Sequence, residues 1–436
     1  MTLGTEPVHG FSVRKLLWAA GVEPHELRLE EYAHVDRGVA LALRGFDSER
    51  SELVEGAVAI TSGVLTRWRQ PRPELVAGLV RCLDLRHAHA AGDAAMVPAR
   101  LTSADSTQDI TAAVPALVRA ARHPYERIAG PAALALALLD HPAVMQPVHR
   151  WLSSSTRLPY FQVTSLGQVL RPLAGRADAL LPGIRRLLVD SAGDEHLRPV
   201  LAALASWGPA ASEAVPELLS TLATRNARWA CDVLGAVGPA AMPAAHTLEA
   251  FVRGTAQPPR HDDGALAPDG VRRWHGVQNA AWAHWRITGE PELFLTFLRD
   301  AAARGLGRAD LGRLAELGPR ARACATAVRP LLESPGAWTR VQAAHAWWRI
   351  TDDADAAVPV LLAALEPLKS GAADEPCRAA VRHIARIGSP ACAAAPLLEA
   401  ALSSDRCFPA DVYPAARAAL AAFETGPRVG RPVPGE

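Results

Sequence analysis

Apolar side chains recur at helical spacing between Trp338 and Leu365, and a short polar segment divides this stretch in two. The apolar face of the first half consists of Ala343, Trp347 and Ile350, at positions i, i+4 and i+7. The Thr-Asp-Asp segment 351–353 then offers side-chain oxygens that cap a helix start. We expect Pro359 in the first turn of a second helix, where its missing N–H costs little. The pattern predicts a pair of short helices.

The same pattern recurs along the chain: an aliphatic or Trp residue closes one helix, and a proline nine residues later opens the next. The clearest copies are Leu138 with Pro147, Leu173 with Pro182, Trp207 with Pro216, Ile350 with Pro359, and Ile387 with Pro396. Ser106 with Pro115 is a weaker copy, and Val237, Ile287 and Leu317 keep the closing residue without the proline. The nine closing positions are 32, 35, 34, 30, 50, 30, 33 and 37 residues apart. A period of about 33 residues predicts stacked helix pairs that share one hydrophobic core.

Three regions depart from this register. Residues 1–105 contain helical stretches without a register, which predicts an irregular helical cap; a small separate domain is the alternative. Those stretches are 14–20, 53–69 and 74–86. Within the array, residues 106–424, the Gly-, Pro- and Asp-rich segment 254–270 accounts for the 50-residue spacing and is expected to be an inserted loop. The tail, 425–436, lacks apolar periodicity and is expected to be disordered.

Composition narrows the class of protein further. Abundant Ala and Leu with only four Tyr favour an all-α chain. The formal net charge of +1 provides no global field for nucleic acid or anionic membranes. The six cysteines show no C-x-x-C spacing, so we expect buried thiols in a reducing cytoplasm. No apolar run reaches the roughly 18 residues of a membrane span, and the N-terminal apolar run is too short for a signal peptide.

Signals for catalysis or metal binding are weak. The sequence lacks H-E-x-x-H, Walker-type G-x-x-x-x-G-K, G-x-S-x-G and zinc-like cysteine spacing. One metal-like cluster consists of His87, His89 and Asp93, but residues two apart on a helix do not share a face. The other, His261-Asp262-Asp263, lies in the expected loop. We therefore expect no catalytic residue, no metal site and no bound cofactor.

Several segments resemble a known repeat family. WGPAASEAVPELLSTL from Trp207, LGPRARACATAVRPLL from Leu317 and IGSPACAAAPLLEAAL from Ile387 are similar to HEAT-like repeats, most closely to the bacterial subtype named after phycobilisome lyases. The resemblance covers residues 106–402 and implies an α-solenoid superhelix. It supplies no catalytic residue, because the repeat consensus contains none, and residues 238–330 depart from its proline pattern.

The resemblance also implies that the second helix of each repeat lines the concave side. The position before the closing residue is Arg286, Arg349 and Arg386 in three copies, and Glu316 in another. The position five before it is Trp282, His345 and Arg382. We predict that six of these residues form a concave partner-binding strip: Trp282, Arg286, His345, Arg349, Arg382 and Arg386. Arginines beside an exposed Trp suit an acidic or aromatic partner. In the alternative, the arginines pair with acidic residues of neighbouring repeats, such as Asp352 or Asp353.

The leading functional hypothesis is a non-enzymatic scaffold that binds a protein or peptide partner through the concave face or the 254–270 loop. A nucleic-acid-binding protein that uses the Arg/Trp strip is one alternative. A lyase or accessory subunit that acts on a bound cofactor is another, and it depends only on the name of the repeat subtype. Neither the partner nor the oligomeric state follows from the sequence.

Overall fold

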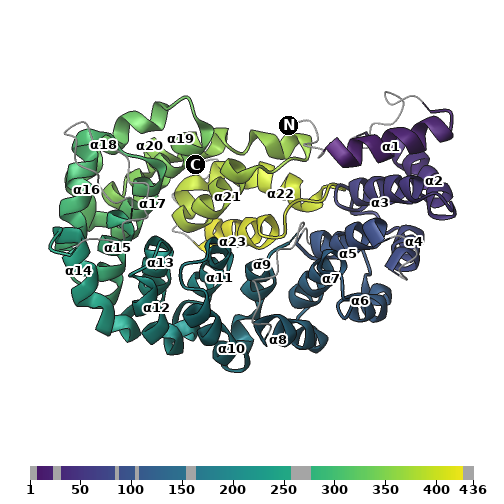
Figure 1. Cartoon of the computed structure of the whole chain (residues 1–436). Helices are drawn as coiled ribbons and strands as arrows, with labels where there is room; N and C mark the ends of the chain where they lie inside the picture. The colour runs from purple at the N-terminus through teal and green to yellow at the C-terminus, as the bar shows by residue number, and fades with distance from the viewer. Residues whose placement is uncertain are drawn as a thin grey trace, which may run out of the picture. The chain divides into compact units, whose positions relative to one another are not determined.

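A computed structural model describes residues 7–22, 31–83, 88–103, 108–153, 164–256 and 276–425 of the chain. Helices follow one another through these ranges, which contain no β-strand (Figure 1). The prediction of an all-α chain is therefore confirmed for the described residues. The chain divides into two compact units: Met1–Ser103 with Thr107–Phe294, and Leu295–Glu436 with Ala104–Ser106.

The first unit arranges its helices in two rows. Its helices are α1 (Pro7–Ala19), α2 (Val35–Phe46), α3 (Ser51–Leu65), α4 (Pro73–Leu83), α5 (Ala88–Ser103), α6 (Val114–Ala120), α7 (Glu126–Leu138), α8 (Met145–Ser153), α9 (Leu166–Leu170), α10 (Ala177–Asp190), α11 (Arg198–Trp207), α12 (Val215–Thr221), α13 (Ala227–Val237), α14 (Ala245–Arg253) and α15 (Val277–Thr288). In one row the odd-numbered helices from α1 to α15 pack each on the next, and in the other α2 packs on α4, α4 on α6, α8 on α10 and α10 on α12. This is the stacking of an α-solenoid.

The second unit repeats this arrangement. Its helices are α17 (Arg308–Leu317), α18 (Ala325–Val328), α19 (Ala337–Thr351), α20 (Ala354–Ala363), α21 (Glu375–Ile387), α22 (Ala395–Ser403) and α23 (Val412–Thr425), and α16 (Glu292–Arg304) runs across the division between the units. The row α17, α19, α21 and α23 packs in chain order, and α18, α20 and α22 pack against it. The predicted helix pairs from 106 onward are thus present in both units.

Four helices of these rows end in a backbone conformation that only glycine adopts readily. The glycines are Gly208, Gly238, Gly318 and Gly388, with φ of 56, 75, 58 and 74° and ψ of −127, −139, −133 and −139°. After each glycine the chain enters a short 3₁₀ turn before the next helix. The turns are η7 (Gly208–Ala214), η8 (Gly238–Ala244), η9 (Gly318–Cys324) and η12 (Ser389–Ala394).

The Thr-Asp-Asp segment ends α19 and begins α20, as predicted. Asp352 closes α19 with a positive φ of 63°, and the Asp353 carboxylate accepts a hydrogen bond from the backbone N–H of Ala356 at 3.2 Å. This cap starts α20 at Ala354, so Pro359 is its sixth residue. The prediction that Pro359 lies in the first turn is therefore wrong. Its missing N–H leaves the carbonyl of Asp355 without a helical donor, and Asp355 is solvent-exposed.

The other prolines divide in the same way. Pro147, Pro216 and Pro396 lie within the first three residues of α8, α12 and α22, as predicted. Pro182, like Pro359, lies inside its helix, at the sixth position of α10. Prolines in the first turn cost no intrahelical hydrogen bond, whereas those at the sixth position each remove one.

Burial agrees with most expectations. Trp347 is 8% exposed, as predicted for the core face of α19. Cys231, Cys324, Cys377 and Cys407 are buried, whereas Cys82 is half-buried and Cys392 is exposed, so the prediction of a buried thiol is wrong for Cys392. Among the described helices, none combines the length and apolarity needed to cross a bilayer.

Candidate partner-binding site

A surface hollow of about 470 Å³ lies within the second unit, along the row of α17, α19 and α21. It is lined by Ala315 and Glu316 of α17, by His345, Trp348 and Arg349 of α19, and by Arg386 of α21. Three of the six residues predicted to bind a partner, His345, Arg349 and Arg386, therefore meet at one place. We call this place the Arg349–Arg386 hollow.

Helical spacing and the repeat register explain why these residues meet. His345, Trp348 and Arg349 are three and four residues apart on α19 and so share one face of that helix. Arg386 holds on α21 the position that Arg349 holds on α19, directly before the closing isoleucine. Because α19 packs on α21, equivalent positions of the two repeats lie beside each other.

The two arginines are exposed and differ in their contacts. The Arg349 Nε–H donates a hydrogen bond to the carbonyl oxygen of Ala315 at 3.2 Å, near the end of α17. Its guanidinium carbon lies 5.8 Å from the centroid of the Trp348 ring. The side chain of Arg386 makes no hydrogen bond or ion pair with any residue of the described ranges. At the rim, Glu316 lies 3.4 Å from Arg313 of the same helix.

His345 is a buried member of the wall. Its ring stacks on that of His383 from α21, with centroids 3.7 Å apart and planes 12° apart. Burial, followed by the nearby charges of Arg386 and Arg349, lowers the pKa of His345 to about 3. Burial also lowers the pKa of His383 to about 2, with smaller contributions from His345, Arg386 and Arg382. Both imidazoles are therefore neutral at pH 7.

Two predicted binding residues are not exposed as the sequence analysis assumed. Trp282 is 8% exposed and packs against Gly235 of α13, where a Cβ atom would come within 2.3 Å of its ring. His345 is also 8% exposed. The expectation of an exposed Trp at position 282 is therefore wrong, because the neighbouring repeat covers it. Arg286 is exposed in the first unit, with its guanidinium carbon 6.0 Å from the Trp282 ring centroid.

Arg382 is engaged within the fold. Its Nη1 lies 2.5 Å from Asp411 Oδ2, and Asp411 also accepts hydrogen bonds from Arg378 Nε at 2.9 and 3.1 Å. The alternative of pairing between neighbouring repeats thus holds for Arg382, with Asp411 as the partner instead of Asp352 or Asp353. Whether any of the six residues binds a partner stays a prediction.

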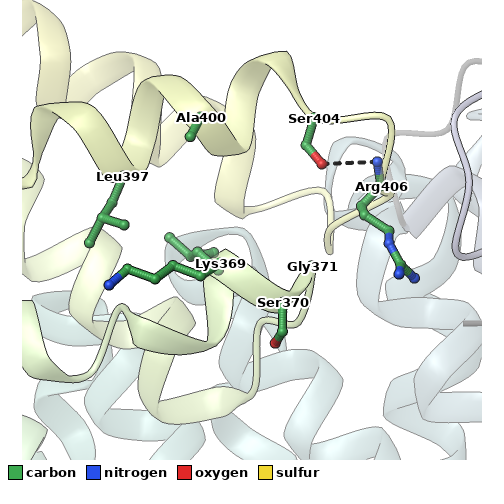
Figure 2. A pocket seen from close by; sticks show the side chains of 8 residues that line it. Lys369, Ser370, Gly371, Leu397, Ala400, Ser404 and Arg406 are labelled. Carbon is green, nitrogen blue, oxygen red and sulfur yellow. Dashed lines mark hydrogen bonds between the residues drawn. The ribbon is translucent and has the colours of Figure 1, made fainter. Parts of the chain in front are cut away.

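A second, smaller hollow of about 280 Å³ lies elsewhere in the same unit (Figure 2). Lys369 and Arg406 contribute its positive charges. The Lys369 ammonium pairs with Glu366 at 2.8 Å, and the Ser404 hydroxyl accepts a hydrogen bond from the backbone N–H of Arg406 at 3.1 Å. Because Lys369 and Ser404 already have partners within the fold, the Arg349–Arg386 hollow is the stronger candidate.

The two metal-like clusters of the sequence, neither of which was expected to be a site, fall partly or wholly outside the described residues, as does most of the expected loop. Of the segment 254–270, only Gly254, Thr255 and Ala256 are described, so His261, Asp262 and Asp263 lie outside. His87 lies outside as well. Among the described positions, no group of three or more His, Cys, Asp and Glu side chains is placed to hold a metal ion.

Trp348, Glu316 and His383 contribute to the hollow or its wall without having been predicted to do so. The signals were present for two of them. Trp348 is three residues after His345, and Glu316 occupies the same register position as Arg349. His383 carries no such signal, because its contact with His345 depends on how α19 and α21 pack.

Comparisons with known proteins give distant structural similarities. Yeast importin-β (Kap95p) is similar over 90% of this chain and 52% of its own, at 13% identity and a TM-score of 0.46, so the chain spans about half of that protein's length. A chain from a structure of the cadherin and β-catenin interaction is similar over 95% of both chains, at 13% identity and a TM-score of 0.37. Kap121p bound to RanGTP is similar over 89% of this chain and 41% of its own, at 15% identity and a TM-score of 0.29. No family model and no curated protein matches the chain. The identities and TM-scores are low, so we take no function from these similarities.

Proposed function

We propose that this chain is a non-enzymatic α-solenoid scaffold that binds a protein or peptide partner, with the Arg349–Arg386 hollow as one contact point. The observation that carries the proposal is the convergence of His345, Arg349 and Arg386 from two successive repeats. Stacked repeats place equivalent side chains in line, and proteins of this architecture use such lines as extended binding surfaces.

The composition of the hollow supports this proposal. Arg and Trp are the residue types most enriched at the positions that dominate the energy of protein interfaces. Arg349 and Arg386 are exposed beside a half-buried Trp348. A planar guanidinium group recognises carboxylates and aromatic faces, and both groups occur on peptides. We also propose that the repeats belong to the bacterial subtype and that the protein is cytoplasmic. Segment 254–270 is proposed as a second contact with the partner.

A nucleic-acid-binding protein is the second candidate. The exposed Arg286, Arg349 and Arg386 share one register position, which favours this alternative. Glu316 occupies the same position on α17 and places a carboxylate in the hollow, where it repels phosphates. Titration with an oligonucleotide tests the alternative, since binding through these arginines weakens steeply as salt increases.

Site-specific photo-cross-linking tests the leading proposal. A photoreactive amino acid replaces Glu316, an exposed residue that lines the hollow, so that both arginines are kept. The full chain is expressed in the organism that supplies the sequence. The matched control replaces Glu399, an exposed residue of α22 outside the hollow. We expect a defined protein adduct from position 316 that is missing from position 399 and disappears when Arg349→Glu is added. Identical adducts from both positions, or no adduct from position 316, would contradict the proposal.

A further inference from the structure

The three arginines along α21 differ in the contacts that their side chains make. Arg378 and Arg382, on successive turns, share the Asp411 carboxylate of the next repeat, at distances of 2.5–3.1 Å. Arg386 lies one turn further along and faces the Arg349–Arg386 hollow without a hydrogen bond or ion pair to any described residue. Arg378 also pairs with Glu375 at 2.6 Å, so the fold supplies carboxylates for the first two arginines and leaves the third open to the hollow.

Arg349 also has N–H donors that make no hydrogen bond within the fold. Its Nε–H is used by the carbonyl oxygen of Ala315 at 3.2 Å. Its two terminal nitrogens form no hydrogen bond with the described part of the chain. Guanidinium groups from two successive repeats therefore present unused N–H donors to one hollow. The paired N–H donors of a guanidinium group match the two oxygens of a carboxylate.

The wall contains a third group that needs a partner. The His345 Nε2 atom is buried and has no hydrogen-bond partner among the described residues, although the ring lines the hollow. A buried polar atom without a partner has lost its hydrogen bonds to water without replacing them, which is unfavourable. A neutral imidazole carries one N–H donor, so a small shift of the ring toward a bound oxygen atom reduces this cost.

The charge of the hollow favours an anion of low charge. Among the lining residues, Arg349 and Arg386 contribute two positive charges, and Glu316 contributes one negative charge that Arg313 of the same helix partly screens. The Glu316 carboxylate repels a phosphate dianion or a chain of phosphates more strongly than a monoanion. The ring of Trp348 and the methyl group of Ala315 supply an apolar wall for the aliphatic part of the side chain that carries the anion.

We infer that the Arg349–Arg386 hollow binds the carboxylate of an Asp or Glu side chain in an acidic peptide segment of the partner, held by both guanidinium groups beside the Trp348 ring. This inference rests on the proposed function and specifies the chemistry of the partner. The hollow volume of about 470 Å³ lies within the range of sites that enclose small ligands.

Peptide selection on the full chain tests the inference. A random linear peptide library is selected against the immobilised wild-type chain and against Arg386→Gln, which removes one guanidinium charge but no internal hydrogen bond. Arg417→Gln, an exposed position of α23 outside the hollow, is the matched control. An unchanged thermal midpoint of each variant confirms that it folds. The enriched peptide, its analogue with Gln in place of Glu (or Asn in place of Asp), its phosphoserine analogue and an oligo-dT strand are then titrated by fluorescence anisotropy.

We expect the selected peptides to carry Asp or Glu at one fixed position. The amide analogue and Arg386→Gln should each weaken binding by about 10- to 100-fold, the loss of one charge-assisted hydrogen bond, whereas Arg417→Gln should leave it unchanged. Peptides without an acidic position, no enriched peptide, or affinity that is insensitive to Arg386→Gln would overturn the inference. If the cross-link from position 316 persists in any of those cases, the proposed function stands and only the acidic chemistry is wrong. Binding of oligo-dT alone, lost in Arg386→Gln, would instead support the nucleic-acid alternative.

Discussion

At the scale of single residues, the adjacent repeat decides what each aromatic or charged side chain does. Trp347 is buried, its Nε1–H donates to the Asp353 carboxylate at 3.1 Å, and the Arg329 guanidinium lies 5.2 Å from its ring centroid. Trp348, the next residue, is only half-buried and lines the hollow. Neighbours in sequence thus have different roles, because a rotation of about 100° per residue points them at different surroundings.

We predict that Trp347→Ala lowers the free energy of unfolding by about 3–5 kcal/mol, because it removes a large buried ring and the hydrogen bond to Asp353. Arg386→Gln, on the exposed end of α21, should change it by less than about 0.5 kcal/mol. Urea unfolding followed by circular dichroism measures both. Equal losses in the two variants would show that the core face and the open face of this row are assigned wrongly.

The stacked His345 and His383 predict that stability falls on mild acidification. Burial lowers the pKa of both side chains, to about 3 and about 2, whereas the unfolded chain titrates near its ordinary value of about 6.5. Below about pH 6.5 the unfolded chain therefore binds protons that the folded chain does not, and the loss continues until the pH reaches the folded pKa values. At pH 5.5 the cost is about 1.4 kcal/mol for each histidine.

Urea unfolding between pH 7.5 and about pH 5.5 measures how the free energy of unfolding changes with pH, which we call the slope. Ordinary carboxylates titrate below this pH range and so contribute little to the slope. The double variant His345→Phe/His383→Phe keeps two stacked rings and removes both titrating groups, so its slope should be clearly smaller. A double variant with the wild-type slope would assign the pH dependence to other residues.

At the scale of elements, two kinds of ending recur among the row helices. Gly208, Gly238, Gly318 and Gly388 end theirs with a glycine-only backbone conformation and a 3₁₀ turn. Asp352 and Gly289, two residues after Ile350 and Ile287, end theirs in the left-handed helical conformation. The first ending brings the glycine close to the next repeat: a Cβ atom at Gly318 would lie 3.4 Å from the carbonyl oxygen of Arg349.

Two substitutions near the same helix test this difference. Gly318→Ala should cost about 1–3 kcal/mol, because alanine is strained at a φ of 58°. Gly312→Ala, inside α17 with no atom within 4 Å of the added methyl group, should stabilise the chain by about 0.5–1 kcal/mol. Thermal or urea unfolding compares the variants, and a stabilising Gly318→Ala would show that the helix end has no such constraint.

At the scale of the whole molecule, each helix packs mainly on helices that are close in sequence, as in a quasi-one-dimensional array. The N-terminal helices follow the same order, since α1 packs on α3, α3 on α5 and α5 on α7. Stability in such an array is close to a sum over repeats and the interfaces between neighbours, so a local defect should have local consequences.

We predict that Trp347→Ala increases amide hydrogen exchange in α19 and in the helices packed on it, α17, α20 and α21. Exchange in α11 and α13 should stay at the wild-type rate, because these helices belong to the first unit and are several repeats away along the chain. Hydrogen exchange followed by mass spectrometry measures both regions. A uniform increase over the described chain would indicate one cooperative unit instead of a sum of repeats.

The sequence predicted those features that depend on residues close together in the chain. Helical periodicity, the Asp353 cap and the register of closing residues are local, so α19, α20 and their recurrence followed from the pattern alone. The same register brought Arg349 and Arg386 to equivalent positions, and the hollow contains both. The glycines that follow several closing residues were an additional signal, present also in copies that lack the later proline.

By itself, the sequence determined an all-α array of helix pairs and the register along which equivalent side chains line up, because an α-helix is specified by spacing within a few turns. Only the tertiary structure decided that Trp282 is covered, that Arg382 is neutralised by Asp411, that His345 stacks on His383 and that Arg386 stays open. Each of those outcomes depends on a neighbour about one repeat away. The packing of adjacent repeats selects that neighbour, and helical spacing within one repeat does not specify it.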